Sequence, residues 1–554
     1  MAQAWLWNSF AGDSSTAVGL DNLCSTARIT LPAIPQIQVL SLTAVERQNY
    51  TFTHNPFMAE QAEPYTGLDF CNVTVTYTRP GWNDTVHVST WLPPPDKWNG
   101  RFLGNGGAGY IHGGESLAQA TMLPGMHLGF AVSTTDGGHS DDFLESIGET
   151  NNWAHSSPGN INWPLLVDFA SVASHDMATI GKAVAKSFYD TAPKYSYFMG
   201  GSTGGRQGHM LAQRYPDDFN GIVAAMPAIN WGTFLLGNLW PAFVMHKLGA
   251  YPRPCEIDAI SHAAIAACDG LDGAEDGIVS RPDLCDFDPQ VLVGKKFDCN
   301  GASATFTTEA AQVVQAAWTG PRSSTGEFQW HGFGVEANLT TMGGTVATMC
   351  DESGACHPTP FTLSAVWIKY WLLKDVSFDL KDIDHAQWDD LFRKNINEYA
   401  SVIETSDPNL SAFNRAGGKL INWHGTGDQA IPFAGSVDYF ERVMKRDPKA
   451  NDYYRLFLAP GASHSMAAGL CPQRQEVLHA LMNWVEKDIA PETLRATGHN
   501  REGIKLERDI CMFPRVQHYV GDDITKSSSF LCKENEESRL DLSRIRLTKR
   551  AGQV

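Results

Sequence analysis

One serine in this chain stands in the setting that nucleophilic catalysis requires. Residues 195–208 read YSYFMGGSTGGRQG, an apolar run that ends in glycines around Ser202. The segment 200–204 matches G-x-S-x-G, which places a serine on a sharp turn between a strand and a helix. Glycines are needed in such a turn because side chains would clash there. We therefore predict that Ser202 is a nucleophile; the alternative is a structural serine in a glycine-rich turn.

A catalytic serine needs a base to take its proton and an acid to orient that base. In folds with this motif the chain order is Ser, Asp, His. Asp428 follows the strand-like run KLINWHG, and His464 follows YYRLFLAP. We predict Asp428 as the acid, the alternative being a solvated turn residue, and His464 as the base. Three other histidines are set aside. His479 lies within a helical pattern, His424 is too close to the acid in the chain, and His209 sits on the helix after the serine.

Acyl transfer also needs two N–H groups to hold the oxyanion. Thr203 directly follows the nucleophile and is expected to supply the first. The second is expected from the loop after an earlier strand, and GNGGAG at 104–109 has that position. We assign it to Gly107, with Gly106 as the neighbouring alternative. A plain glycine turn is the competing interpretation.

These residues must be brought together by strands and helices that alternate along the chain. Residues 71–92 predict a hairpin, and buried strands are expected at 100–104, 126–135, 195–199, 220–228, 418–424 and 453–459. Helical spacing occurs at 165–186, 209–215 and 473–487. This alternation predicts an α/β fold with a mostly parallel sheet covered by helices.

The alternation stops between residues 230 and 415, a segment rich in cysteine and aromatic residues. We therefore predict a discontinuous catalytic domain, 1–229 and 416–554, with 230–415 inserted as a lid. The lid contains WGTFLLGNLWPAF (231–243) and FTLSAVWIKYW (361–371), whose aromatic residues offer an apolar slot for an aromatic group or simply form the lid core.

A second site is predicted in the lid, where residues 268–278 read CDGLDGAEDGI. Asp269, Asp272 and Asp276 alternate with glycines in a tight turn, and their charges repel unless a cation bridges them. Carboxylate and carbonyl oxygens are the ligands that Ca²⁺ prefers. The pattern is not that of an EF-hand, and aspartate turns without metal are the alternative.

Composition excludes several classes of function. The chain has 554 residues, 43% of them hydrophobic, and a formal net charge of −19. Such an acidic protein repels phosphate backbones, so we expect no nucleic-acid partner, and no apolar run is long enough for a membrane span. Eleven cysteines and five N-x-S/T sequons favour the secretory route. Residues 1–16 lack a basic, apolar leader, so we expect secretion with the signal peptide already removed; the alternative is a protein that stays inside the cell.

Taken together, these motifs resemble the tannase/feruloyl esterase family of secreted serine esterases. The resemblance covers nearly the whole chain and rests on GNGGAG, STTDGGH (133–139), GGSTGGRQG (200–208), ACDGLDGAEDGI (267–278), HGTGD (424–428) and APGASH (459–464). It implies an α/β-hydrolase core with a lid, the triad Ser202, Asp428 and His464, and a structural calcium. The calcium ligands that it implies are the side chains of Asp269, Asp272 and Asp276 and the carbonyls of Ala274 and Ile278.

The chain departs from the family at one point. Many members have a cysteine before the nucleophile and another after the histidine, joined in a disulfide, whereas this chain has Gly201 and Ser465. The histidine loop must then be held by packing and hydrogen bonds. The disulfides we expect are Cys24–Cys71, Cys268–Cys285 and Cys511–Cys532, with Cys350–Cys356 as a further small loop and Cys471 as a remaining thiol.

The function expected from this resemblance is hydrolysis of aromatic acid esters, galloyl, feruloyl or a related hydroxybenzoyl or hydroxycinnamoyl ester, through an acyl-enzyme. The partner is then a small-molecule aromatic ester. One alternative is an esterase or lactonase for another aromatic metabolite or a synthetic aromatic ester. A different class is a non-catalytic binding protein on the same fold, against which the intact triad argues. The sequence sets neither the individual substrate nor the oligomeric state.

Overall fold

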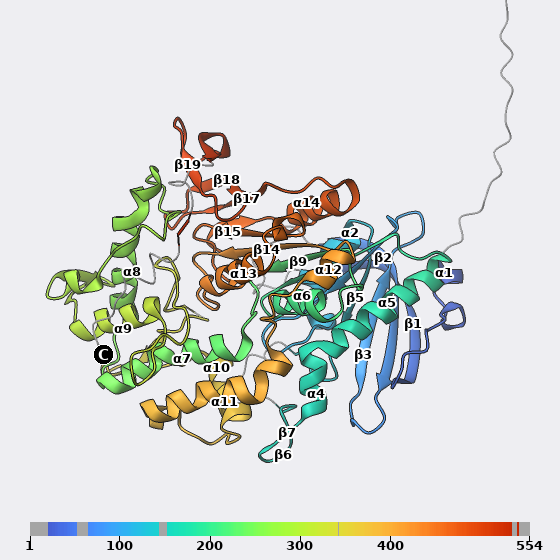
Figure 1. Ribbon diagram of the computed structural model, residues 1–554, viewed down its shortest axis with the longest axis horizontal. Helices are drawn as coiled ribbons and strands as arrows, with labels where there is room; N and C mark the ends of the chain where they lie inside the picture. Colours follow the sequence, from blue (N-terminus) through green and yellow to red (C-terminus); the bar gives the residue numbers. More distant parts are fainter. Residues whose placement is uncertain (1–19, 53–64, 143–151, 342, 534–539, 542–554) are drawn as a thin grey trace, which may run out of the picture.

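A nine-stranded mixed sheet forms the centre of the molecule, with strand order β1-β2-β3-β5-β4-β8-β9-β14-β15. The computed structural model describes residues 20–52, 65–142, 152–341, 343–533 and 540–541 (Figure 1). Antiparallel strands make up one end of the sheet, β1 (Gln38–Phe52), β2 (Tyr65–Thr78), β3 (Val86–Leu92) and its neighbour β5 (Ala131–Thr135). The predicted hairpin at 71–92 is confirmed as β2 and β3.

The parallel half of the sheet carries the motifs. It runs from β5 through β4 (Arg101–Asn105), β8 (Tyr195–Gly201), β9 (Gly221–Ala225) and β14 (Lys419–Gly425) to β15 (Tyr454–Ala459). These strands are almost wholly buried, as expected for parallel strands covered on both faces. Because the strands are parallel, the loops after β4, β8, β14 and β15 emerge at one edge of the sheet, where ligands bind in such folds.

Helices cover both faces of the sheet. One face packs against α5 (Ala173–Tyr189), α6 (Thr203–Arg214) and α13 (Ala434–Arg446), and the other against α2 (Ala118–His127) and α14 (Arg474–Lys487). Before α5, the chain forms the short hairpin β6 (His155–Ser157) and β7 (Asn160–Ile161), then α4 (Trp163–Val167) and a π-helical turn (Asp168–Val172). The predicted α/β fold is thus confirmed.

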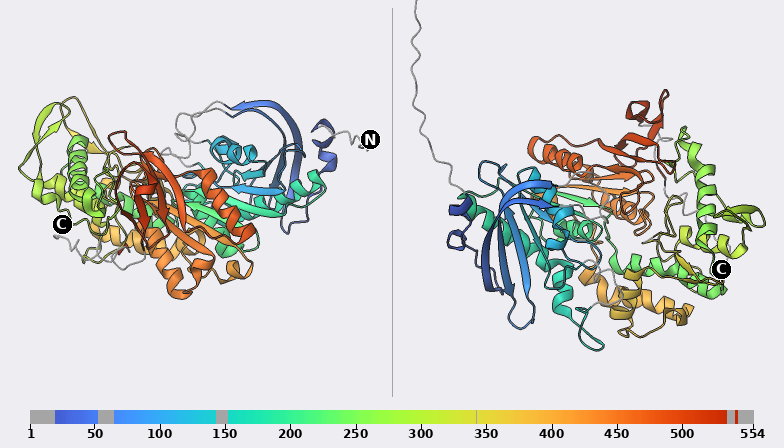
Figure 2. Two further views of the ribbon diagram at one scale, coloured as in Figure 1. Left: turned by 90° about the horizontal axis from the view of Figure 1, so that it is seen from above. Right: turned by 180° about the vertical axis from the view of Figure 1, so that it is seen from behind.

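The chain leaves the sheet after β9 and returns at β14, which pairs directly with β9. The intervening segment, called the lid below, lies beside the sheet and supplies most of a hydrophobic core that also takes in Tyr110 and Phe169 (Figures 1 and 2). Its longest helices are α7 (Trp231–Leu248), which is buried on all sides, and α11 (His385–Ile403), which is amphipathic and begins with a capping box at Asp384. The limits that we set for the two domains stay a prediction. The other lid elements are α8 (Pro254–Cys268), β10 (Lys296–Cys299), β11 (Ala302–Thr305), α9 (Thr308–Thr319), β12 (Thr348–Cys350), β13 (Cys356–Pro358), α10 (Thr362–Val366), a π-helical turn (Trp367–Leu372) and α12 (Ser411–Arg415).

After β15 the chain adds a smaller three-stranded sheet, β16 (Gly469–Pro472), β17 (Thr493–His499) and β18 (Lys505–Cys511), and the pair β19 (Gln517–Tyr519) and β20 (Phe530–Cys532). Disulfides occur at all four expected pairs, Cys24–Cys71, Cys268–Cys285, Cys350–Cys356 and Cys511–Cys532, and also at Cys255–Cys299. Cys471 remains a buried thiol, as expected.

The described helices, the N-terminal stretch and one sequon bear on the expected secretion. Of the helices that the structure describes, none combines the length and the apolar character needed to cross a bilayer. The N-terminal stretch on which the expected loss of a leader depends, residues 1–16, lies outside the described residues. Among the sequons, Asn72 is buried and its amide donates to Glu115 Oε1 at 2.8 Å, so the folded protein has no room for a glycan there.

Candidate active site

Ser202 occupies the turn between β8 and α6, with φ +58° and ψ −119°. A residue with a side chain adopts such a conformation only where its surroundings hold it there. Its N–H donates to the carbonyl of Ala225 at 3.0 Å, and its own carbonyl accepts from Ala228 at 3.1 Å. A Cβ at Gly200 would lie 2.5 Å from the backbone of Gly204, so the turn closes only with glycine at that position. The predicted strained turn is present.

The three predicted triad side chains, 262 and 36 residues apart in sequence, meet at the edge of the sheet. His464 Nε2 lies 3.1 Å from Ser202 Oγ, and His464 Nδ1 lies 2.8 Å from Asp428 Oδ2. An ionised carboxylate can only accept, so Nδ1 carries the imidazole proton and Nε2 is left to accept the serine proton. This is the geometry that general-base activation of a serine requires.

Asp428 is held by four donors. Its Oδ1 accepts from the backbone N–H groups of Ala430 and Ile431, each at 2.8 Å, and Oδ2 faces both His464 and His424, the latter at 3.2 Å. The side chain is 1% exposed. Burial alone would raise the pKa of Asp428, but the two histidines hold it well below its ordinary value. The four donors and the two histidines thus favour the ionised form of the acid.

Burial acts in the opposite direction on the base. It lowers the pKa of His464, but the charge of Asp428 and the hydrogen bond to it outweigh burial, so the pKa lies above the usual value for histidine. The imidazolium that forms when Ser202 attacks is thereby stabilised. His464, paired with Asp428, can therefore accept the serine proton and later return it to the leaving group.

His424, which the sequence analysis set aside, turns out to contact the acid. It is fully buried, and its Nε2 faces both Asp428 Oδ2 and the carbonyl of Ile431, at 3.2 and 3.1 Å. Both are acceptors, so Nε2 carries the proton and Nδ1 accepts from the Ser436 hydroxyl at 2.8 Å. His424 is thus the second histidine that donates to the acid. In the sequence, only its position within HGTGD points to this role.

The two expected oxyanion donors differ in their surroundings. Thr203 is the first residue of α6, where an N–H has no partner within the helix, and its hydroxyl donates to the carbonyl of Gly109 at 2.6 Å. Gly107 lies beside it, since its carbonyl accepts from Gly204 at 3.0 Å. The N–H of Gly107, however, donates to Gln207 Oε1 at 3.0 Å. Gly107 can bind an oxyanion only by giving up this bond, so its assignment stays a prediction.

The aspartate loop of the lid (residues 269–280) folds back on its own carboxylates. Asp269 accepts from the N–H of Gly277 at 3.0 Å, Asp272 from Ala274 at 2.9 Å, and Asp276 from Ile278 at 3.1 Å. Asp276 also forms a buried ion pair with Arg508 of β18. Within the described residues, no three His, Cys, Asp or Glu side chains converge as a ready metal cluster.

The charge of the aspartate loop nevertheless suits a divalent cation. Arg508 is the one guanidinium that pairs with an aspartate of the loop among the described ion pairs, and its partner is Asp276, so Asp269 and Asp272 have no such ion pair among them. Burial raises the pKa of Asp272 to about 6, and it also raises the pKa values of Asp269 and Asp276. A bound cation would offset the cost of burying this negative charge, and carboxylate and carbonyl oxygens are the ligand types that Ca²⁺ takes.

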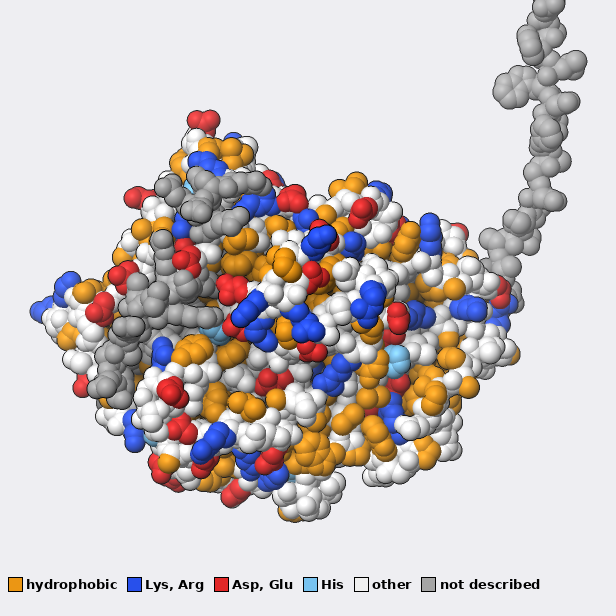
Figure 3. All heavy atoms as spheres, in the orientation of Figure 1, with side chains coloured by type: hydrophobic (Ala, Val, Ile, Leu, Met, Phe, Trp, Pro, Cys, Tyr) orange, Lys and Arg blue, Asp and Glu red, His pale blue; other side chains and the backbone are white. Residues whose placement is uncertain are grey.

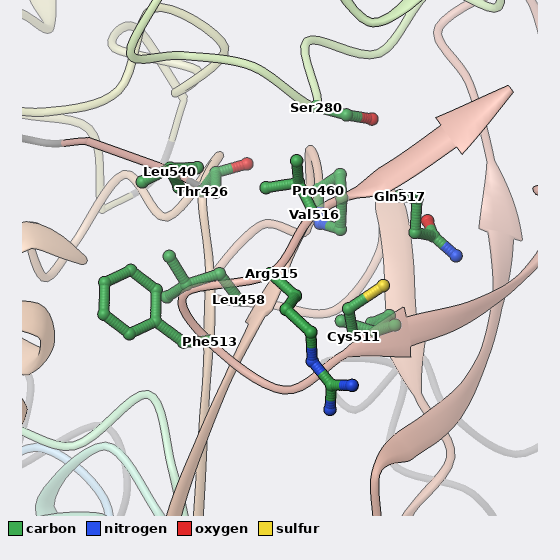
Figure 4. A pocket seen from close by; sticks show the side chains of 11 residues that line it. Ser280, Thr426, Leu458, Pro460, Cys511, Phe513, Arg515, Val516, Gln517 and Leu540 are labelled. Atoms are coloured by element: carbon green, nitrogen blue, oxygen red, sulfur yellow. The ribbon is translucent and has the colours of Figure 1, made fainter. Parts of the chain in front are cut away.

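A pocket lies behind the catalytic loops, between the ends of β14 and β15 and the segment 511–517 (Figure 4). Thr426 and Pro460 line it from the backs of the two loops, and Ser280 lines it from the lid. None of the three triad side chains is among its lining residues. The pocket is therefore separate from the place where Ser202 would meet a substrate.

Comparison with known proteins identifies the family to which the chain is similar. The sequence model described as "Tannase and feruloyl esterase" matches residues 71–533. The chain is 40% identical over 534 residues to a probable feruloyl esterase of Arthroderma benhamiae, covering 95% of this chain and 96% of that one. It is 29% identical to a tannase of Aspergillus oryzae, covering 88% and 89%. The solved tannin acyl hydrolase from Aspergillus niger superposes with a TM-score of 0.82 at 27% identity, covering 96% and 98%.

Proposed function

This chain belongs to the tannase and feruloyl esterase family, and we propose that Ser202, His464 and Asp428 are the residues through which it cleaves esters of aromatic acids. It is a carboxylic ester hydrolase, as its relatives are. The observation that carries the proposed mechanism is the continuous chain of contacts from Ser202 Oγ through His464 to Asp428, at 3.1 and 2.8 Å.

In the proposed reaction, His464 Nε2 takes the Ser202 proton as Oγ attacks the ester carbonyl. Asp428 holds Nδ1 and stabilises the imidazolium. The N–H of Thr203 holds the oxyanion, joined by that of Gly107 once it releases Gln207. His464 then gives its proton to the departing alcohol or phenol, and water repeats the sequence on the acyl-enzyme.

The aromatic acyl group is inferred from the relatives, whose names specify feruloyl esters and tannins. The lid is consistent with this proposal because it contributes many aromatic side chains to the hydrophobic core beside the sheet. Most of them form its core, since Trp231, Trp367 and Trp371 are at most 1% exposed. Tyr110 of the glycine loop after β4 stacks on Trp371 at 5.3 Å, so lid and catalytic loops share one aromatic cluster.

The test is hydrolysis of methyl gallate, methyl ferulate and methyl 4-hydroxybenzoate by the protein and by Ser202→Ala, together with labelling by a fluorophosphonate. We expect at least one aromatic ester to be cleaved, the variant to be inactive, and the label to sit on Ser202. Cleavage of p-nitrophenyl acetate alone would instead favour an esterase or lactonase for other aromatic esters. No labelling of a folded protein would favour a binding protein and contradict the proposed mechanism.

We further propose that the aspartate loop binds a structural Ca²⁺ through Asp269, Asp272 and Asp276 with the carbonyls of Ala274 and Ile278. The support is that three carboxylates, one buried and two half-buried, share a single paired guanidinium, that of Arg508. Metal analysis of the purified protein, followed by chelation and readdition of Ca²⁺ during thermal unfolding, tests this. An unchanged melting temperature and no bound metal would contradict it.

Secretion is also proposed. Five disulfides support it, because such bonds persist in oxidising compartments. On the face shown in Figure 3, Lys and Arg side chains are scattered among Asp and Glu and do not gather into a basic patch. That surface, with a net charge of −19, agrees with a small-molecule partner and not with nucleic acid.

A further inference from the structure

One buried carboxylate of the lid touches the framework of both loops that carry the catalytic acid and base. Glu336 lies 90 residues before Thr426 in the sequence, and its Oε2 accepts from the Thr426 hydroxyl at 3.2 Å. Its Oε1 accepts from the N–H of Val279, in the aspartate loop, at 2.8 Å. Thr426 is two residues before Asp428. The two oxygens of Glu336 thus join the aspartate loop to the loop after β14 that carries Asp428 (residues 424–431, the acid loop).

Thr426 passes this contact on to the histidine loop. Its hydroxyl oxygen accepts from the N–H of Gly461 at 2.8 Å, and Gly461 is three residues before His464. The Thr426 N–H donates to the carbonyl of Ala459 at 2.9 Å. A hydroxyl has a single proton to donate and an ionised carboxylate can only accept, so ionised Glu336 turns the Thr426 hydroxyl toward its Oε2 at 3.2 Å in preference to the carbonyl of Ala459 at 3.5 Å. Its free lone pairs are thereby presented to Gly461.

Two glycines show how closely these segments are packed. A Cβ at Gly334 would lie 2.1 Å from the carbonyl oxygen of Thr426, so the lid backbone rests directly on the acid loop. Gly461 has φ +64°, and a Cβ there would lie 3.1 Å from Glu336 Oε1. Glu336 thus lies against the histidine loop at Gly461, and the lid backbone two residues before it lies against the acid loop at Thr426.

Among the described residues, no disulfide joins the loops that carry Ser202, Asp428 and His464. The neighbours of Ser202 and His464 are not cysteines, and the five disulfides join other positions. Besides the contacts of Thr426, the N–H of His464 donates to Gln429 Oε1 at 3.0 Å. The spacing between the acid and histidine loops thus depends on hydrogen bonds and packing, and Glu336 is the lid side chain that binds Thr426, the residue that joins the two loops.

We propose that Glu336 is a positioning residue of the triad. It orients Thr426 and through it Gly461, so that the loops carrying Asp428 and His464 keep their spacing and stay aligned with the aspartate loop of the lid. This inference rests on the proposed function only in taking Asp428 and His464 as the acid–base pair.

The test compares Glu336→Leu, which keeps bulk and removes both acceptors, with a matched change elsewhere in the lid. Glu256 is also buried, and its Oε1 accepts from the N–H and the hydroxyl of Thr307 at 2.7 and 2.8 Å. We expect Glu336→Leu to lower kcat about 10- to 100-fold with KM within about twofold, since small displacements of catalytic groups cost that much. Glu256→Leu should lower the melting temperature and leave kcat unchanged.

A second pair of variants covers the case in which Glu336→Leu does not fold. Thr426→Val removes the hydroxyl, and Thr426→Ser retains it. We expect Thr426→Val to lower kcat and the rate of Ser202 phosphonylation by the same factor, and Thr426→Ser to restore both. Equal kcat in Thr426→Val and Thr426→Ser would overturn the proposal.

Hydrogen exchange followed by mass spectrometry gives a readout that does not depend on turnover. Peptides covering residues 424–431 and 459–466 should exchange faster in Glu336→Leu and Thr426→Val, and at the wild-type rate in Glu256→Leu. Equal exchange in all variants would overturn the proposal. Loss of the proposed function would show differently, as a wild-type protein that neither cleaves an ester nor reacts at Ser202.

Discussion

Replacing the acid by its amide should separate the orienting role of Asp428 from its bulk. Asp428→Asn keeps the shape of the side chain and turns one of two acceptor oxygens into an NH₂ donor. In the native structure both oxygens face donors: Oδ1 faces Ala430 and Ile431, and Oδ2 faces His464 and His424. An asparagine can satisfy only one of these two pairs, whichever way its amide is turned.

The size of the expected loss in kcat depends on which pair of donors the new NH₂ group faces. If the NH₂ faces His464, the imidazole must accept at Nδ1 and carry its proton at Nε2, where it cannot take the serine proton. Wrong-tautomer variants of this kind lose about 10⁴-fold in kcat. At about 1.4 kcal/mol per tenfold, this is a barrier increase of about 5 kcal/mol. If the NH₂ instead faces Ala430 and Ile431, the acid loop loses both of its backbone anchors.

The assay is kcat and kcat/KM as a function of pH on the ester that the wild type cleaves best. Asp428 holds the pKa of His464 above its usual value, against the effect of burial, so the wild-type acid limb lies at a higher pH than an isolated histidine would give. Removing the charge lowers that pKa, and the residual activity should persist to lower pH. Asp218→Asn, which alters the pair His175–Asp218 outside the triad, is the matched control. A kcat within tenfold of wild type, or an acid limb that does not move, would refute the reasoning.

Three further outcomes are expected. Gly200→Ala should lose most activity and about 1–3 kcal/mol of stability, because its Cβ would overlap the Gly204 backbone. Gly201→Ala should be tolerated, since the nearest atom to the added Cβ is 3.6 Å away. Activity assays and chemical denaturation compare the two variants. Gly201→Cys with Ser465→Cys should form a disulfide and raise the melting temperature with kcat largely retained, as measured by thiol titration and thermal unfolding. Chelation should lower the melting temperature of the wild type but not that of Asp272→Asn, and a chelator shift of equal size in both would contradict the calcium proposal.

Local signals were sufficient to predict the nucleophile and the sheet that carries it. Gly200 is required by its contact with the backbone of Gly204, four residues later, so this constraint depends only on neighbouring residues. The buried parallel strands are recognisable because both of their faces are covered, which makes them apolar throughout. Asp428 and His464 could be predicted because each follows such a strand and the strands' ends meet at one edge.

The direction of individual groups could not be predicted in the same way. The glycine run at 104–109 indicates a tight approach, and a Cβ at Gly107 would indeed lie 2.1 Å from the Ile111 carbonyl. The partner of its N–H is Gln207, 100 residues later, and no spacing rule connects the two. The long edge strand β1 was also missed, because its residue types do not follow its exposure: Val45 is exposed and Glu46 is half-buried. Cys255–Cys299 was not predicted either, since its partners lie 44 residues apart without a shared motif.

The contacts of the lid show why it belongs to the catalytic framework. Asn238 of α7 donates to the carbonyl of Ala430 at 2.6 Å, and Ala430 is one of the backbone anchors of Asp428. Glu336 contacts the same loop from its other end through Thr426. At the base of the lid, Arg206 of the nucleophile helix α6 donates to the carbonyl of Ile403 in α11 at 3.4 Å. A segment that moved away as a whole would break contacts behind both the acid and the nucleophile. Substrate must therefore reach Ser202 with these contacts in place, and any opening that admits it is confined to parts of the lid that do not make them.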